Sequence, residues 1–153
     1  MKMFIPVLVL VTSFSAFANS PCGEKNLGKP HTNGGGFVEN TAFAAATAYV
    51  DKLAVVCSTA KILDHAIIKG SALITGKATV DKNAVVAEAA LITGKAHITD
   101  SAEVSGESVV TGFAVVYGQS KIKEDSVVTG NAVVSDNAVI SGDAVISGNA
   151  MVS

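Results

Sequence analysis

A six-residue repeat runs from Gly34 to Ser153 without a break, and it constrains the fold more than any other feature of the chain. The last four units read GNAVVS, DNAVIS, GDAVIS and GNAMVS, and the same frame gives twenty consecutive units. The third position is always small, with Ala in sixteen units, and the fifth is aliphatic from Val38 to Val152. Because one such unit cannot bury its own apolar side, the units must bury it against one another.

The alternation inside each unit predicts a short strand. A small third, an outward fourth, an aliphatic fifth and an outward sixth residue have the period of two that strands show. The first two positions are rich in Gly, Asn, Asp and Lys, which is typical of turns. This spacing fits a coil of three strands, eighteen residues around, that stacks at about 4.8 Å per coil. The predicted fold is therefore an all-β triangular prism of about 6–7 coils, roughly 32 Å long.

The repeat resembles the hexapeptide repeat of left-handed parallel β-helices, and the resemblance covers residues 34–153. It implies a left-handed coil. Two kinds of relative suggest different functions: bactofilin-type proteins stack end to end into filaments, and acyltransferases form trimers with a catalytic His beside an extruded loop. The frame of this chain contains no insertion that could form such a loop.

The first eighteen residues have the features of a secretory signal peptide. Lys2 supplies the positive charge, Phe4 to Val11 form an apolar run, and Ala16-Phe17-Ala18 is a small-x-small cleavage pattern. A membrane anchor is the alternative, but the apolar run is too short to span a bilayer. We therefore expect a bacterial protein exported to the periplasm, cell surface or medium, with no membrane span after cleavage. Residues 19–33 carry no periodicity and predict a loop that caps the first coil.

Cys22 and Cys57 are the two cysteines of the chain. In an oxidising compartment an even pair favours a disulfide, and two unpaired thiols are the alternative.

Composition argues against several classes of partner and ligand. The net charge is −2, and no basic face indicates nucleic acid. No motif predicts a cofactor, and His31, His65 and His97 lack the spacing of the three zinc ligands of gamma-class carbonic anhydrases, so no metal site is expected. One corner is acidic, and solubility explains it better than Ca²⁺ binding; its residues are Glu88, Glu107, Glu124, Asp125 and Asp143.

One face of the predicted prism is apolar at every level, because residues eighteen apart stack on one another. Its outward fourth positions are Phe37, Val55, Leu73, Leu91, Val109, Val127 and Val145, and beside them lie Thr75, Thr93, Thr111 and Thr129. This row covers roughly 300 Å², the low end of the largest apolar patch on a monomer. It is either a contact surface between copies or the result of strand propensity and duplication.

The last hexad predicts a second contact. Val152 belongs to a coil that is followed by no further residue in the sequence, so we expect an open sheet edge there. Such an edge either pairs with another copy, giving a homo-oligomer or an end-to-end polymer, or is solvated.

These features favour a non-catalytic, exported structural or adhesive β-helix that self-associates through this end, the apolar face, or both. The alternative is a reduced acyltransferase with a site at a trimer interface near His97. His97 is the one histidine at an outward strand position, with Lys61, Thr79, Asp81 and Thr99 as expected neighbours. A solvated surface histidine is the favoured explanation, because one convex prism offers a general base no enclosed pocket.

Overall fold

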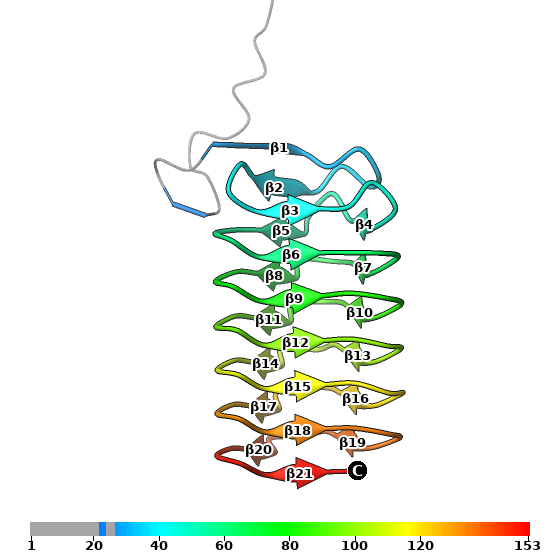
Figure 1. Ribbon diagram of the computed structural model, residues 1–153, viewed down its shortest axis with the longest axis vertical. Helices are drawn as coiled ribbons and strands as arrows, with labels where there is room; N and C mark the ends of the chain where they lie inside the picture. Colours follow the sequence, from blue (N-terminus) through cyan, green and yellow to red (C-terminus); the bar gives the residue numbers. More distant parts are fainter. Residues whose placement is uncertain (1–21, 24–26) are drawn as a thin grey trace, which may run out of the picture.

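The computed structural model describes residues 22–23 and 27–153, which form an all-β prism (Figure 1). The predicted signal peptide, residues 1–18, lies outside the described residues. Within the described part of the chain there is no helix, and hence none that could cross a membrane.

Twenty short strands, β2 to β21, make up the prism, and each begins six residues after the one before. Three successive strands complete one turn of the coil. In Figure 1 the nearer strands run left to right as the chain descends and the fainter, more distant strands run right to left, so the coil is left-handed. The predicted left-handed parallel β-helix is confirmed, and the six-residue repeat continues without insertion or deletion between residues 34 and 153.

The strands fall into three sheets, one on each side of the prism. The strip sheet, which carries the apolar row, contains β1 (Gly28–Pro30), β2 (Phe37–Glu39), β5 (Val55–Val56), β8 (Leu73–Ile74), β11 (Leu91–Ile92), β14 (Val109–Val110), β17 (Val127–Val128) and β20 (Val145–Ile146). The His97 sheet contains β3 (Phe43–Ala44), β6 (Lys61–Ile62), β9 (Thr79–Val80), β12 (His97–Ile98), β15 (Val115–Val116), β18 (Val133–Val134) and β21 (Met151–Val152). The six-stranded sheet contains β4 (Tyr49–Val50), β7 (Ile67–Ile68), β10 (Val85–Val86), β13 (Glu103–Val104), β16 (Lys121–Ile122) and β19 (Val139–Ile140).

Pairing inside each sheet follows the predicted eighteen-residue step. Val55 pairs with Leu73 in the strip sheet, and His97 pairs with Val115 in the His97 sheet, both in parallel. The core is a stack of third- and fifth-position side chains, most of them fully buried. Where the third residue is serine the hydroxyl is also buried, and it donates to the carbonyl three residues earlier, as Ser108 does to Ser105 at 2.8 Å. The small third position therefore tolerates a polar atom only because the bend supplies an acceptor.

The turns explain the residues at the first position of each unit. From Ser58 to Gly148 all sixteen of these residues have a positive φ; nine are Gly and seven carry a side chain. Glycine adopts this conformation without steric cost, which accounts for its frequency there. In most turns the N–H of the second residue then donates to the carbonyl of the first residue of the corresponding turn one coil below, as Lys77 N does to Gly94 O at 2.7 Å.

Two features of the backbone differ from the sequence-based expectation. The predicted strands of four residues are two residues long, except for β2, because the chain already bends at the third and sixth positions. The segment predicted as a loop contains β1, which pairs antiparallel with β2. Beyond β1, Asn33 and Gly36 exchange backbone hydrogen bonds with Val50 at 3.0 and 2.9 Å, and thereby cover the upper edge of the six-stranded sheet.

Candidate functional site

The apolar strip is continuous from β5 to β20. Its fourth-position side chains are half-buried from Val55 to Val127, and Val145 is 64% exposed. The four threonines from Thr75 to Thr129 lie beside them, also half-buried. Six successive levels thus present an aliphatic side chain in the same orientation, in a parallel sheet whose registers do not shift.

Phe37 does not belong to this exposed strip, and the prediction that it does is wrong. Its exposed fraction is 7%, and Glu39 and Cys57 in the adjoining column are 6% and 3% exposed. The cause is β1, which lies against β2 so closely that a Cβ added to Gly28 would come within 2.4 Å of Phe37 Cζ. The N-terminal segment therefore removes the uppermost level of the strip from solvent.

The two edges of the strip differ in charge. On one side runs the corner formed by Gly76, Gly94, Gly112, Gly130 and Gly148, next to the exposed Lys77 and Lys95. On the other side runs the predicted acidic corner, with Glu88, Glu107, Glu124, Asp125 and Asp143.

Some acidic side chains support the turns. Glu88 Oε2 accepts a hydrogen bond from Gly106 N at 2.6 Å, and Glu124 Oε2 accepts one from Gly142 N, in each case one coil further on. These carboxylates satisfy the first-position N–H groups of the next turn, a structural role that solubility alone does not explain.

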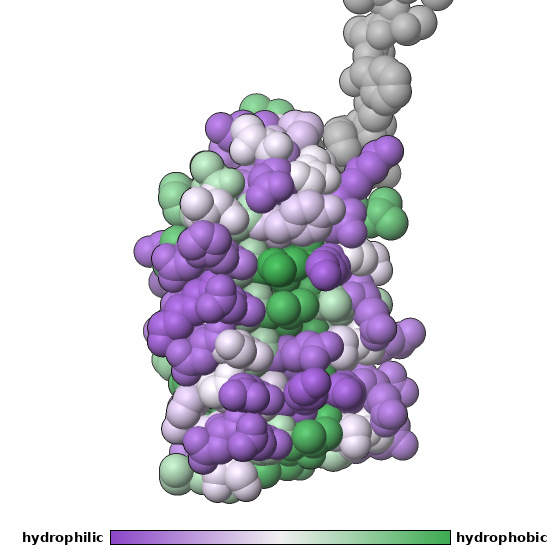
Figure 2. All heavy atoms as spheres, turned by 90° about the vertical axis from the view of Figure 1, so that its right-hand side faces the viewer, coloured by the Kyte–Doolittle hydropathy of each residue, from purple (hydrophilic) through white to green (hydrophobic). Residues whose placement is uncertain are grey.

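The other two faces are not apolar throughout. Figure 2 shows the six-stranded sheet, where an apolar patch gives way to polar side chains and then to a second patch. The interruption is the exposed pair of Lys121 and Glu103, whose Nζ and Oε2 atoms are 3.4 Å apart. On the His97 sheet, Lys61, Thr79 and His97 precede Val115. The strip sheet alone therefore presents an unbroken apolar row.

His97 contacts Asp81, one of its predicted neighbours. Its Nε2 lies 2.8 Å from Asp81 Oδ2, and the His97 side chain is 41% exposed. Asp81 Oδ1 and the hydroxyl of Thr99, one coil below Asp81, are buried without a hydrogen-bond partner in the structure. Such a carboxylate can orient an imidazole as a base, yet the cavity described next lies at the upper end of the sheet, three strands above His97.

A cavity of about 320 Å³ lies near the upper edge of β3. Lys29 and His31 from the N-terminal segment, Glu39 from β2 and Phe43 from β3 are among the residues that line it. His31 Nε2 is 3.0 Å from the carbonyl oxygen of Ala45, so the imidazole helps to close the upper edge of the first coil. No residue near His97 lines this cavity.

Lys82 and Asp100 form an ion pair at the corner next to His97, with 2.5 Å between Nζ and Oδ1. Their hydrogen bond raises the pKa of Lys82 and lowers the pKa of Asp100. The N–H of Gly118, 3.3 Å from Asp100 Oδ2, lowers the pKa of Asp100 further.

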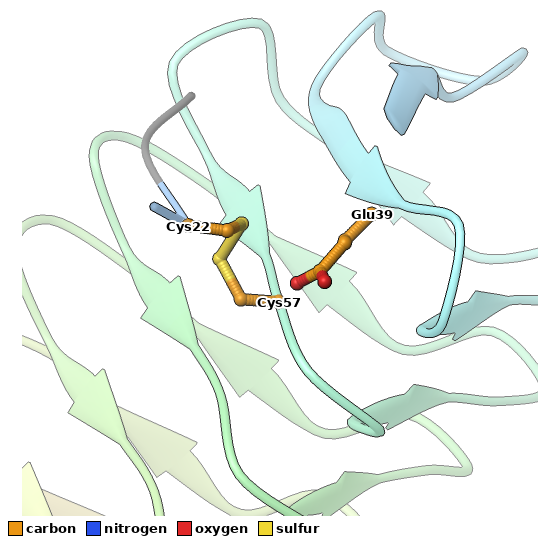
Figure 3. Close-up of side chains that lie close together, drawn as sticks. All are labelled: Cys22, Glu39 and Cys57. Carbon is orange, nitrogen blue, oxygen red and sulfur yellow. A yellow bond between two sulfur atoms is a disulfide. The ribbon is translucent and has the colours of Figure 1, made fainter. Parts of the chain in front are cut away.

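The predicted disulfide between Cys22 and Cys57 is present, with 5.5 Å between the Cα atoms (Figure 3). It joins the N-terminal segment to the residue after β5. Glu39 points toward it from β2, and Glu39 Oε2 accepts a hydrogen bond from Ser58 N at 2.6 Å. The eighteen-residue step of the repeat stacks Glu39 above Cys57, but sequence reasoning gave this carboxyl group no role.

The lowest strand of each sheet carries an exposed apolar side chain in the outward position. Val139, Val145 and Met151 are 60%, 64% and 79% exposed, and Val152 is half-buried on β21.

Comparison of the chain with protein-family models, with curated proteins and with solved structures finds no match.

Proposed function

We propose that the protein is a non-catalytic structural or adhesive β-helix that self-associates through the apolar strip. The observation that supports this proposal most is the unbroken row from Val55 to Val145, which neither of the other faces repeats. An exposed apolar row bordered by polar residues is typical of an interaction surface. Its six levels share one spacing, so a second copy of the chain offers a strip of matching length and pitch.

The charges at the two edges favour one orientation of the pair. A two-fold axis parallel to the prism axis places the acidic corner of one copy opposite the lysine-bearing corner of the other. At equal levels this brings Glu88 opposite Lys95, and no like charges meet. Prisms running in opposite directions would instead place Glu88 opposite Glu107. We therefore propose a dimer with parallel prism axes, whose orientation the edge charges select.

This contact has modest affinity, because a strip of roughly 300 Å² per copy buries less than a standard specific interface. Association should therefore increase over a concentration series.

Sedimentation or light scattering from micromolar to millimolar protein tests the strip directly. Val127→Lys should weaken association by at least tenfold, because it places a charge in the apolar contact. Val133→Lys is the matched control: it lies one hexad later, on the His97 sheet, and is similarly half-buried. A protein that stays monomeric throughout, or equal effects of the two variants, would contradict the proposal.

A second route of association is end to end through β19, β20 and β21, as in bactofilin-type proteins. The described upper end argues against an uninterrupted stack of prisms, because β1 and the Asn33–Gly36 segment already occupy the upper edges of two sheets. Val152→Asp should shorten any assemblies that use this route, and leave the strip dimer intact.

Two further parts of the proposal concern family and location. The eighteen-residue coil and the small third position support membership of the hexapeptide-repeat β-helices. The Cys22–Cys57 disulfide supports export to an oxidising compartment, that is, the bacterial periplasm, surface or medium.

Acyl transfer near His97 is the second candidate function, and the Asp81–His97 contact is the observation that favours it. The frame from residue 34 to residue 153 extrudes no loop that would enclose a substrate. Incubation with an acyl-thioester donor and amine or hydroxyl acceptors tests this candidate. Turnover that His97→Ala removes would establish the enzyme; His97→Ala should leave self-association unchanged if the leading proposal holds.

A further inference from the structure

Two cysteines and one buried carboxyl group meet at the top of the strip sheet. The two sulfurs and a carboxylate oxygen of Glu39 all lie within 4.8 Å of one another. Cys57 and Glu39 are 3% and 6% exposed, and Cys22 is half-buried. Among the described residues, no other group of three or more potential metal ligands lies this close together.

We propose that the reduced form of this cluster is a metal site, in which Cys22, Cys57 and Glu39 bind a thiophilic divalent cation such as Zn²⁺. Reduction comes first. A dithiol reductant donates two electrons and two protons to the Cys22–Cys57 disulfide. The S–S bond of the protein breaks to give two thiols, and the reductant is oxidised to its own disulfide. Metal binding then releases the two protons from the thiols, and two Cys Sγ–metal bonds form. The two thiolates and the carboxylate leave a fourth, tetrahedral position for water.

The geometry needs only a small adjustment. With Zn–S bonds of about 2.3 Å, tetrahedral thiolates lie about 3.8 Å apart. Cα atoms 5.5 Å apart can place two sulfurs at that distance without unfolding the first coil.

Charge and burial also favour a cation here. None of the ion pairs among the described residues includes Glu39, and its side chain accepts a hydrogen bond from Ser58 N. A buried carboxylate is stabilised by a cation or by metal coordination. The metal would replace the disulfide as the link between the N-terminal segment and the coil, so the covering of Phe37 would persist after reduction.

Co²⁺ titration of the full chain, reduced with a phosphine that is then removed, tests the site. We expect one Co²⁺ per chain, with thiolate-to-cobalt charge-transfer absorption and the visible bands of a tetrahedral complex. Zn²⁺ should displace Co²⁺ and raise the melting temperature of the reduced protein, because it binds the folded state. The oxidised protein should bind neither ion.

Variants separate the three ligands. Cys22→Ser and Cys57→Ser should each abolish the charge-transfer band or halve it, and Glu39→Gln should weaken Co²⁺ binding at least tenfold while the disulfide still forms. Glu103→Gln, an exposed carboxyl group on the six-stranded sheet, is the matched control and should change nothing. Absence of the band at saturating Co²⁺, equal affinities of Glu39→Gln and the unaltered protein, or one metal per two chains would overturn the proposal.

Discussion

The strip sheet and the His97 sheet share one interior and differ in their exteriors. Both bury a small third residue, which is Ala except at Gly36, Ser108 and Ser126 of the strip sheet, and both bury Val or Ile at the fifth position through most of the prism. Outward, one sheet repeats Val or Leu at each exposed level, while the other changes from Lys61 through His97 to Val133. The interior is therefore fixed by the fold, and the outward positions are free to carry function. Four experiments test how far the two sheets are equivalent.

Loss of the disulfide should have the largest effect. Cys57→Ser opens a loop whose ends are 35 residues apart, which the chain-entropy model values at roughly 4 kcal/mol. The bond attaches to the strip sheet alone, so its loss should expose Phe37 and Glu39 first. Denaturant unfolding of the oxidised protein measures the free energy, and hydrogen exchange shows where protection is lost. Uniform loss of protection in all three sheets would contradict a local role.

Overfilling the core tests whether the two interiors are equivalent. Ala90 precedes β11 of the strip sheet and Ala96 precedes β12 of the His97 sheet, and they are 0% and 1% exposed. Replacing either by Leu should cost about 1–3 kcal/mol or more, because the side chain would meet the opposite wall. Calorimetric or denaturant unfolding should give similar values for both. Costs that differ by more than the measurement error would show that the sheets are not interchangeable inside.

The corner that joins the two sheets should respond next. Gly112 has φ +73°, and a Cβ there would lie 2.6 Å from Gly130 O. Gly148, in the same column, has φ +68° and no atom within 4 Å of an added Cβ. Gly112→Ala and Gly148→Ala should both cost roughly 1–2 kcal/mol from the left-handed conformation, and Gly112→Ala should cost more. Equal unfolding free energies would mean that the stacked backbones separate easily.

The ion pair of Lys82 and Asp100 should have the smallest effect, because both groups are exposed and salt screens them. The lowered pKa of Asp100 gives stability above the ordinary carboxyl pKa of 3.8, which is lost as the pH falls through the lowered value. The raised pKa of Lys82 gives stability below the ordinary 10.5, which is lost as the pH rises through the raised value. Melting curves of Asp100→Asn and the unaltered protein should therefore differ slightly near neutral pH and converge at both extremes, or in molar salt.

Much of the architecture follows from the sequence because the period of six is both the strand spacing and a third of a coil. The register of Val55 with Leu73, and the burial of the fifth positions from Val50 to Ile140, need no information beyond that period. The residues of the strip below Phe37 follow for the same reason. The disulfide follows from two cysteines and an inferred oxidising compartment.

The features that the sequence did not predict depend on the segment outside the repeat. β1 has no periodicity to reveal it, and it buries Phe37, which the repeat places on the surface. By contrast, the repeat does place Asp81 near His97, and in the structure the Nε2 of His97 lies 2.8 Å from Asp81 Oδ2. The repeat places Glu39 above Cys57, but the disulfide beside it and the strand paired with β2 come from the segment outside the repeat.

Because the coils of the prism have nearly the same sequence, strands can pair one coil out of register with hardly any change in buried surface. Shifting the pairing by eighteen residues would again set Val against Ile and Ala against Ala throughout the prism. Cys57 breaks this degeneracy, because it is the single cysteine within the repeat and therefore the one residue there with which Cys22 can form a disulfide. The disulfide therefore selects the native register of the first coil, and the coils below follow from it. Apolar packing cannot make this selection, because it is nearly the same in a shifted register.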